Sequence, residues 1–318
     1  MMYHDATVSA VERARIAKFG MYRPEMESDA CGVGVIAATD GKPSRRVVVA
    51  GIEALKAVWH RGAVDADGKT GDGAGIHVEL PLSFFNEHIG RAGHAPKPNL
   101  LAVGQVFLPR TDLAAQESCR TIVESEIIDF GYKVYGWRQV PVDISVIGDK
   151  AMQSRPEIEQ IMIAGPLPAA DGDPAVIEAF EKDLFLIRRR IEKRVIEAQI
   201  QGFYICSLSA RSIIYKGLFL AEELSVFYPD LMDERFQSRF AIYHQRYSTN
   251  TFPQWWLAQP FRCLAHNGEI NTIRGNTNWM KSHEIKMAAA AFGEHSGDIK
   301  PLIPAGASDT AALDAVFE

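Results

Sequence analysis

The sequence predicts a fold of the α+β class, in which antiparallel sheets are covered by helices. Short apolar, β-branched runs occur in groups along the 318 residues, and a few long amphipathic helices separate these groups. Hydrophobic residues make up 47% of the chain and charged residues 23%, so a sizeable core is expected. The sequence has no internal repeat, no low-complexity segment and no linker-like stretch. We therefore expect one domain.

The elements follow from local periodicity. Alternating or continuous apolar runs predict strands at 33–37, 76–80, 100–108, 133–140, 142–147, 159–164, 203–208, 212–215 and 239–243. Steps of three and four between apolar residues predict helices at 46–59, 112–129 and 175–199. The last helix also carries Arg188, Arg189, Arg190 and Lys193. We interpret these four side chains as a solvated basic face rather than a nucleic-acid-binding surface.

Composition excludes several classes of function. The formal net charge is −6 and no long basic tract is present, which argues against binding to nucleic acid or to an anionic membrane. No apolar run reaches the roughly 18 residues that a membrane-spanning helix needs. The four cysteines form no CxxC pair and no zinc-like spacing, so we expect no metal site. The polar segment before Cys31 lacks an apolar signal region, and we expect a cytoplasmic protein with free thiols.

Residues 28–36 (SDACGVGVI) place Cys31 at the mouth of a predicted strand, with glycine at 32 and 34. A cysteine at a strand tip, next to a residue without a side chain, can be approached closely by a substrate. The alternative is that Cys31 is a small buried hydrophobic residue, as many single cysteines are. Both interpretations stay open on this stretch alone.

A polar loop, residues 244–251 (HQRYSTNT), follows the strand expected at 239–243. Arg246 in this loop can hold a carboxylate through two parallel charge-assisted hydrogen bonds. The alternative is an exposed arginine at the end of a strand.

The Asn267-Gly268 step has two interpretations. Asn-Gly is typical of a type I′ hairpin turn. The side-chain amide of an asparagine and the N–H beside a glycine can also both point at a developing oxyanion.

Residues 71–75 (GDGAG) are rich in glycine but do not form a phosphate-binding loop. They lack the lysine and hydroxyl of that motif, and they precede a strand instead of opening a helix. We expect close backbone packing there.

Taken together, these stretches resemble the class II glutamine amidotransferases. The resemblance is carried by residues 30–34 (ACGVG), 60–63 (HRGA), 70–76 (TGDGAGI), 244–253 (HQRYSTNTFP), 258–261 (AQPF) and 264–272 (LAHNGEINT). Within that family, the run from 244 to 280 is most similar to the glutamate synthases. The wide separation of Cys31 from Arg246 in the sequence also resembles that of the glutamate synthases. The resemblance covers the chain from Cys31 onward.

The resemblance implies an Ntn-hydrolase fold, a four-layer αββα sandwich of two antiparallel sheets between helices. It also implies that residues 1–30 are a propeptide whose removal makes Cys31 the N-terminal residue of the domain 31–318. Physical chemistry agrees, because an α-amine with a pKa of about 7.7–8.0 is a suitable base beside a thiol with a pKa of about 8.5. No histidine partner is then required.

The resemblance further assigns roles to single residues. Cys31 attacks the side-chain amide of L-glutamine, while Asn267 and the Gly268 N–H hold the oxyanion. Arg246 binds the α-carboxylate, with Thr249 beside it, and Asp309 takes the α-ammonium. Arg61 is expected near the nucleophile. For Asp309 the sequence leaves an alternative open, because Ser308 or Asp309 could equally be a helix N-cap.

The function implied is the glutaminase part of a glutamate synthase. By resemblance, ammonia passes to a flavin-dependent synthase domain of the same parent chain, which converts 2-oxoglutarate to glutamate. The resemblance implies no cofactor in this chain, but FMN and an iron–sulfur cluster in the full-length parent. It also allows for a partner that supplies electrons, a small NAD(P)H-oxidising subunit or ferredoxin.

Two alternatives remain beside this function. The chain could be an unprocessed or truncated fragment that folds but does not react. It could also be a papain-like Cys-His amidohydrolase that uses His60, His244 or His266.

Finally, the sequence predicts a helix that begins at Ser308-Asp309 and still has its apolar face when the sequence stops at Glu318. We therefore expect the parent protein to continue beyond this residue.

Overall fold

The computed structural model describes residues 11, 14–15, 17–20, 32–95, 100–167, 174–246, 252–287 and 292–318. The chain forms two compact units, residues 1–31 and residues 32–318. The strands of the described residues all belong to the second unit. Cys31 and Thr249, two of the expected site residues, lie outside the described residues, as does most of the expected propeptide.

The first sheet is antiparallel and has the strand order β1-β8-β2-β7. Its strands are β1 (Val33–Ala37), β8 (Phe240–Gln245), β2 (Ala74–Glu79) and β7 (Ser212–Gly217). The first and last strands of the described residues are thus neighbours in this sheet. Their register places Val33 opposite His244, so the start of β1 meets the end of β8.

The second sheet is also antiparallel, with the order β4-β5-β3-β6. Its strands are β4 (Lys133–Gln139), β5 (Glu157–Ala164), β3 (Leu101–Leu108) and β6 (Tyr204–Ser209). Every residue of β3 is buried. A strand covered on both faces needs apolar residues on both, which explains the continuous apolar run in its sequence.

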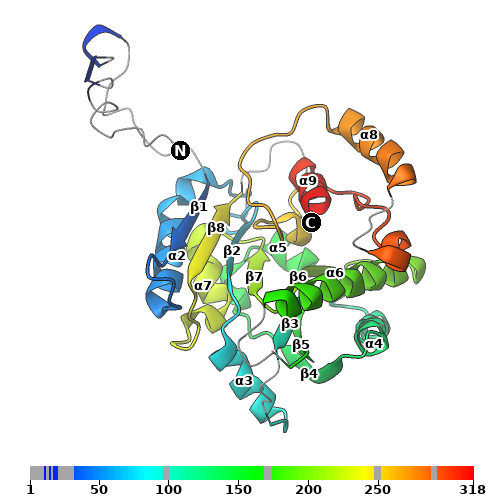
Figure 1. The fold of residues 1–318 in the computed structure, drawn as a ribbon. Coiled ribbons are helices and arrows are strands. Elements are labelled where there is room, and N and C mark those ends of the chain that lie inside the picture. The colour runs from blue at the N-terminus through cyan, green and yellow to red at the C-terminus, as the bar shows by residue number, and fades with distance from the viewer. Residues whose placement is uncertain are drawn as a thin grey trace. The chain divides into compact units, whose positions relative to one another are not determined.

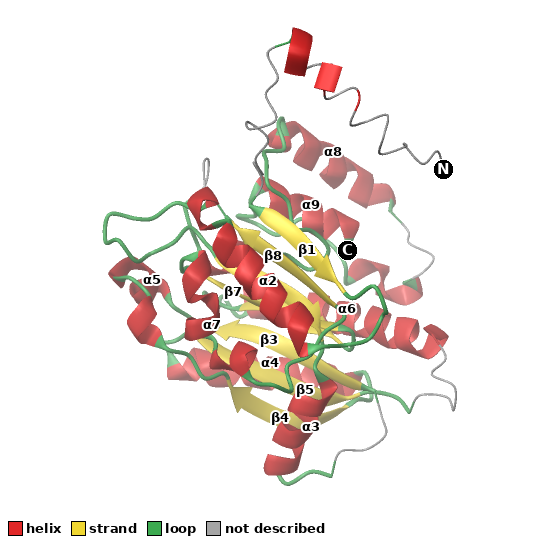
Figure 2. Cartoon of the chain, turned by 90° about the vertical axis from the view of Figure 1, so that its left-hand side faces the viewer, coloured by secondary structure: helices red, strands yellow, loops and turns green. Residues whose placement is uncertain are grey.

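Helices cover the two sheets and complete an αββα sandwich, as Figures 1 and 2 show. Helix α2 (Arg45–Ala57) packs against the first sheet, where a Cβ on Gly51 would lie only 2.6 Å from the Cβ of Ala241. Helices α4 (Leu113–Asp129) and α6 (Pro174–Glu197) share an apolar core with the second sheet. The larger core contains side chains of both sheets and of α2. This architecture confirms the predicted fold class.

The remaining helices are α3 (Leu82–Arg91), α5 (Asp149–Ser154), α7 (Leu224–Phe227), α8 (Ile273–Lys286) and α9 (Asp309–Phe317). Of these five helices, only α9 was predicted from the sequence. Among the helices of the described residues, none is both long enough and apolar enough to cross a membrane.

The strand predicted at 142–147 is wrong. Residues Ile144–Val146 form a single 3₁₀ turn instead. The side chain of Asp143 accepts hydrogen bonds from the backbone N–H of Ser145 at 2.9 Å and from its hydroxyl at 2.6 Å. Such local bonds compete with strand pairing, and they decide the conformation here.

The solvated basic face predicted on the helix at 175–199 is wrong for Arg188 and Arg189, although the helix itself is confirmed as α6. Arg188 and Arg189 are only 2% and 7% exposed. Arg189 donates to the carbonyl oxygen of Ile299 at 3.1 Å and to that of Pro301. The segment 292–318 covers this side of α6, and a periodicity argument does not reveal a cover that comes from so far along the chain.

Candidate active site

The candidate site lies where β1 begins and β8 ends. The backbone N–H of Gln245, the last residue of β8, donates to the carbonyl oxygen of Gly32 at 2.6 Å. A Cβ on Gly32 would lie 2.4 Å from the carbonyl oxygen of Gln245, so only glycine fits there. The residue that directly follows Cys31 is therefore held against the residue that directly precedes Arg246.

Arg246 is buried, with 7% of its surface exposed. Its backbone N–H donates to the carbonyl oxygen of Gly73 at 2.8 Å, and its Nη1 donates to that of Asp72 at 3.4 Å. Burial lowers the pKa of Arg246, and the carboxylates of Asp72 and Asp309 act in the opposite direction. The predicted alternative, an exposed arginine at a strand end, is thus wrong.

The glycines beside Asp72 allow the backbone of residues 71–75 to lie close to Arg246 and to other backbone segments. A Cβ on Gly71 would lie 2.4 Å from the carbonyl oxygen of Phe219, and one on Gly75 would lie 2.5 Å from that of Gln259. Gly73 has a φ of 134°, a conformation that other residues rarely adopt. The close backbone packing expected for residues 71–75 is confirmed.

Asp309 is the first residue of α9. The N-cap is Ser308, whose hydroxyl oxygen accepts the N–H of Ala311 at 3.2 Å. The carboxylate of Asp309 accepts the N–H groups of Thr310 and Ile270, each at 2.7 Å. The capping alternative therefore applies to Ser308. The carboxylate of Asp309 binds the loop that precedes α8, and its charge acts to raise the pKa of Arg246, which burial lowers.

The loop with Asn267 and Gly268 is held at His266, the residue just before them. The side-chain amide of Gln259 accepts the N–H of His266 at 2.9 Å and donates to its carbonyl oxygen at 3.0 Å. The Nε2 of His244 donates to the same carbonyl oxygen at 3.0 Å.

Asn267-Gly268 does not form the predicted type I′ hairpin turn. That turn needs a positive φ at both central residues. Among the described residues other than glycine, only Gln199 and Thr272 have one. No strand flanks this step either.

His244 is a poor candidate for a catalytic base. It is 1% exposed, and burial lowers its pKa to about 4. Because its Nε2 faces a carbonyl oxygen, which can only accept, the proton of the neutral ring is on Nε2. The ring of His266 is directed at the hydroxyl of Thr310, with Nδ1 and Oγ1 3.4 Å apart.

Arg61 lies beside Gly32. It ends a short 3₁₀ turn, Trp59–Arg61, and a Cβ on Gly32 would be 3.5 Å from the Cβ of Arg61. The next residue, Gly62, packs on the side chain of Gln245, so a Cβ there would lie 2.0 Å from Nε2. The structure thus brings Arg61, Arg246, Asp309 and the Asn267-Gly268 loop to the same end of the first sheet.

Comparison with known proteins agrees with this geometry. The family model described as "Glutamine amidotransferases class-II" matches residues 31–318. The chain belongs to the class II glutamine amidotransferases. The two-sheet fold and this family match leave the papain-like alternative without support.

Three relatives of this class II amidotransferase show its wider context. It is 65% identical over 305 residues to the "Glutamate synthase [NADPH] large chain" of Azospirillum brasilense, covering 96% of this chain and 20% of that protein. It is 42% identical over 294 residues to the "Ferredoxin-dependent glutamate synthase 1, chloroplastic/mitochondrial" of Arabidopsis thaliana, covering 92% of this chain and 18% of that protein. It is 40% identical over 308 residues to the "Glutamate synthase [NADH]" of Saccharomyces cerevisiae, covering 95% of this chain and 14% of that protein. The chain thus spans about a fifth of the first of these relatives and less of the others.

Asp72 and Gln259 were not predicted as parts of the site of this amidotransferase, and His244 was named only as a possible base in the papain-like alternative. All three stand inside stretches that carry the family resemblance, at 70–76, 258–261 and 244–253, but the resemblance assigned them no role. Polar residues at the centre of such a stretch were the available signal. The side chains of Gln259 and His244 bind the backbone of His266, and the backbone carbonyl of Asp72 accepts a hydrogen bond from Arg246. No pattern of spacing reveals such contacts.

The described residues of the amidotransferase do not fit an iron–sulfur cluster or a metal ion. Within them, no three side chains of histidine, cysteine, aspartate or glutamate gather in a way that could hold a metal. Cys119 and Cys206 are buried free thiols, and Cys263 is a free thiol in a loop.

Proposed function

We propose that this chain hydrolyses L-glutamine to glutamate and ammonia as the glutaminase part of a glutamate synthase. The observation that carries the proposal is the meeting of Arg246, Asp309 and the Asn267-Gly268 loop beside Gly32. A buried cation and a carboxylate whose charges act on each other match the two charged groups of a free amino acid. A substrate held there would direct its side chain toward the start of β1.

The binding roles follow from charge. Arg246 would hold the α-carboxylate of glutamine with its planar guanidinium, and Asp309 would hold the α-ammonium. Thr249 would contact the same end of the substrate. Desolvation of Arg246 strengthens its attraction for a carboxylate, because few water molecules compete for the guanidinium. Arg61 would lie near the nucleophile.

The chemical step begins at Cys31 after residues 1–30 have been removed. The new α-amine takes the thiol proton, and the thiolate forms a bond to the carbonyl carbon of the side-chain amide. Asn267 and the Gly268 N–H stabilise the negative oxygen of the tetrahedral intermediate. The α-ammonium returns its proton to the leaving nitrogen as the carbon–nitrogen bond breaks. Water then cleaves the thioester, releasing glutamate and the free thiol.

The parent protein would use the ammonia. By analogy with the relatives, a synthase domain outside this chain would combine it with 2-oxoglutarate, with FMN and an iron–sulfur cluster supplying the reduction. The names of the three relatives specify NADPH, ferredoxin and NADH. This region is similar in all three, so it does not determine the electron donor. We propose a cytoplasmic location, which suits the free thiols.

The test compares chain mass and labelling in the wild type and in Cys31→Ala. We expect the wild type to lose residues 1–30, to react with a diazo-ketone analogue of glutamine at Cys31 and to release ammonia from glutamine. Cys31→Ala should neither be labelled nor release ammonia. A chain that still carries residues 1–30 and hydrolyses glutamine at the rate of the processed chain would contradict the mechanism. A chain that keeps residues 1–30 and is inert would support the unprocessed alternative.

A further inference from the structure

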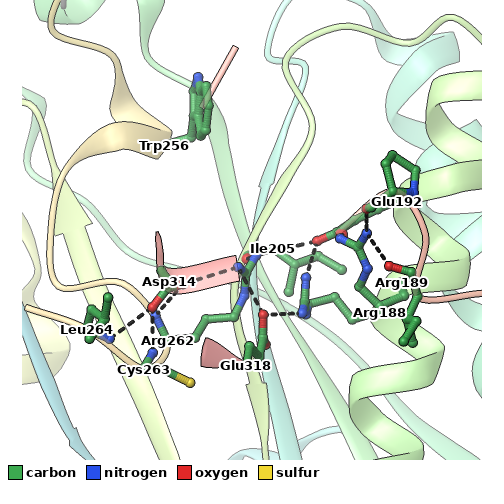
Figure 3. A network of polar contacts seen from close by, with 12 residues as sticks. Arg188, Arg189, Glu192, Ile205, Trp256, Arg262, Cys263, Leu264, Asp314 and Glu318 are labelled. Carbon is green, nitrogen blue, oxygen red and sulfur yellow. Dashed lines mark hydrogen bonds and ion pairs between the residues drawn. The ribbon is translucent and has the colours of Figure 1, made fainter. Parts of the chain in front are cut away.

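Asp314 of α9 holds the start of the loop that leads to Asn267 and Gly268. Its Oδ1 accepts the backbone N–H groups of Cys263 at 2.8 Å and Leu264 at 2.9 Å. Its Oδ2 accepts the backbone N–H of Arg262 at 3.4 Å. The residue is 1% exposed, and Figure 3 shows the carboxylate facing this turn. A buried carboxylate bound to successive backbone N–H groups fixes the direction of the chain strongly.

Arg262 connects the same turn to the second sheet. Its Nη2 donates to the carbonyl oxygen of Ile205 on β6 at 2.7 Å, and its guanidinium carbon lies 5.1 Å from the centre of the Tyr204 ring. Nη1 of Arg262 is 3.9 Å from Oδ2 of Asp314. The positive charge of Arg262 thus compensates the buried charge of Asp314.

Glu192 links this pair to α6. One of its oxygens is 3.4 Å from Nη2 of Arg262, and it accepts hydrogen bonds from Arg188 at 2.6 Å and Arg189 at 2.8 Å. Burial would raise the pKa of Glu192, but the three arginines outweigh it, so the pKa lies below its usual value. Figure 3 shows these side chains as one connected network. The turn at 262–264 is therefore attached to α6, the longest helix among the described residues.

The far end of the loop is held by the same helix α9. Asp309 accepts the N–H of Ile270 at 2.7 Å, and it stands about one and a half turns before Asp314 along the helix. Asn267 and Gly268 lie between the two anchored points. One rigid helix thus fixes the loop on both sides of the proposed oxyanion donors.

We propose that Asp314, supported by Arg262, is a positioning residue for glutamine hydrolysis. It holds the turn at 262–264 so that the amide of Asn267 and the N–H of Gly268 are aimed at the oxyanion before the substrate reacts. This inference rests on the proposed function, because it needs these two groups to be the oxyanion donors. Asp314 itself does not contact the substrate.

The test is Asp314→Asn in the protein at its full natural length. The substitution keeps the shape of the side chain but removes the charge that Arg262 compensates. Small displacements of groups that stabilise a transition state cost up to about 100-fold in rate, so we expect kcat for glutamine hydrolysis to fall about 10- to 100-fold. KM should change less than about threefold, because Arg246 and Asp309 are retained.

A second readout separates positioning from a general loss of structure. A glutamine analogue with an aldehyde in place of the amide forms a tetrahedral adduct with the Cys31 thiol, and the oxygen of the adduct needs the oxyanion donors. L-glutamate can bind through Arg246 and Asp309 alone. We expect Asp314→Asn to weaken binding of the aldehyde at least about tenfold, as expected for a group bound in the transition state, and to leave the binding of L-glutamate nearly unchanged.

Glu126→Gln is the matched control. Glu126 on α4 is also a buried carboxylate, 2% exposed, and is paired with Arg190 at 2.8 Å and Arg194 at 2.7 Å. It does not hold the loop, so its variant should lose thermal stability without losing kcat. If Asp314→Asn does not fold, Arg262→Lys keeps the charge but loses the planar fork, and it should lower kcat and aldehyde affinity in the same direction.

The outcomes distinguish this inference from the function on which it rests. A processed wild type that does not hydrolyse glutamine would overturn the proposed function. An active wild type together with an Asp314→Asn variant of unchanged kcat and aldehyde affinity would overturn the role of Asp314 alone. Equal losses of aldehyde and L-glutamate binding would also overturn it, because they would show a general loosening of the site.

Discussion

The carboxylate of Asp309 accepts the backbone N–H of Ile270 at 2.7 Å. This bond joins the residue that we propose binds the α-ammonium of glutamine to the loop that carries the proposed oxyanion donors. On this proposal, Asp309 contributes both to substrate recognition and to transition-state stabilisation, and variants of Asp309 can separate the two.

Asp309→Asn should raise KM for glutamine with a smaller effect on kcat. The variant keeps an oxygen that can accept the N–H of Ile270, but it loses the negative charge that attracts the α-ammonium. Asp309→Ala loses both and should lower kcat as well. Steady-state kinetics measure KM and kcat of the two variants. A variant of an exposed residue, Asp129→Asn, is the control. The role of Asp309 is wrong if both variants keep the wild-type KM.

Arg246→Lys should raise KM for glutamine about tenfold or more, because lysine keeps the charge but cannot form two parallel hydrogen bonds with a carboxylate. Glutamine that does bind should still react, so kcat should stay within about twofold. Arg239→Lys is the control, since Arg239 precedes the other end of β8, is exposed and pairs with Glu79. A loss confined to kcat would argue that Arg246 acts on the chemistry and not on binding.

Asn267→Ala removes one proposed oxyanion donor and should lower kcat about 10²- to 10³-fold, with a smaller change in KM. Asn276→Ala is the control, because Asn276 is an exposed residue of α8 whose side chain donates to the carbonyl oxygen of Asn271 at 3.3 Å. An unchanged kcat in Asn267→Ala would show that the residue only shapes the loop.

The strands and the long helices could be predicted because their signals are local. The apolar run of β3 and the three- and four-residue spacing of α6 each lie within one element. Asp143 shows the limit, since one side chain bonded to its own turn replaces a strand that the apolar pattern favoured. Arg188 and Arg189 show another limit. They are buried by residues more than a hundred positions later in the chain.

The distinction between local signals and contacts from distant parts of the chain also applies to the site. Arg246, Asn267 and Gly268 could be selected because they stand in stretches that resemble family motifs. Asp309 could be selected because the resemblance assigns it the α-ammonium. Their meeting at one end of the first sheet depends on the pairing of β1 with β8 and on the docking of α9. The structural roles of Gln259 and His244 were missed because both side chains bind the carbonyl oxygen of His266. Bonds to backbone leave no pattern in the sequence.

Gly32→Ala should reduce both stability and glutaminase activity, because the new Cβ would lie 2.4 Å from the backbone oxygen of Gln245. Either the contact between β1 and the residue before Arg246 must open, or Cys31 must shift. Gly90→Ala in α3 is the contrasting variant. A Cβ there meets nothing within 4 Å, and alanine favours a helix by about 0.5–1 kcal/mol over glycine. Thermal unfolding measures the stability of the two variants, and ammonia release measures their activity. Equal stability and activity in the two variants would contradict the close approach at Gly32.

Because Lys216 of β7 is buried, we expect the free energy of unfolding to depend on pH. The lysine is fully buried, its Nζ donates to the carbonyl oxygen of Trp256 at 2.9 Å, and the rings of Tyr204 and Phe261 lie 4.8 and 4.6 Å from it. Burial lowers its pKa to about 7.

In the unfolded chain the pKa of Lys216 returns to about 10.4. Between these two values the unfolded state binds more protons than the folded state, so the free energy of unfolding rises with pH. Below pH 7 the lysine is charged in both states and adds no further slope. Lys216→Met has a similar length and no titrating group, so the rise should be missing in this variant. Urea unfolding of both proteins at pH 7, 8 and 9 measures the difference between their free energies of unfolding. We expect that difference to shift in favour of the wild type, by at most about 1.4 kcal/mol per pH unit. A constant difference would mean that the amine keeps its usual pKa in the folded protein.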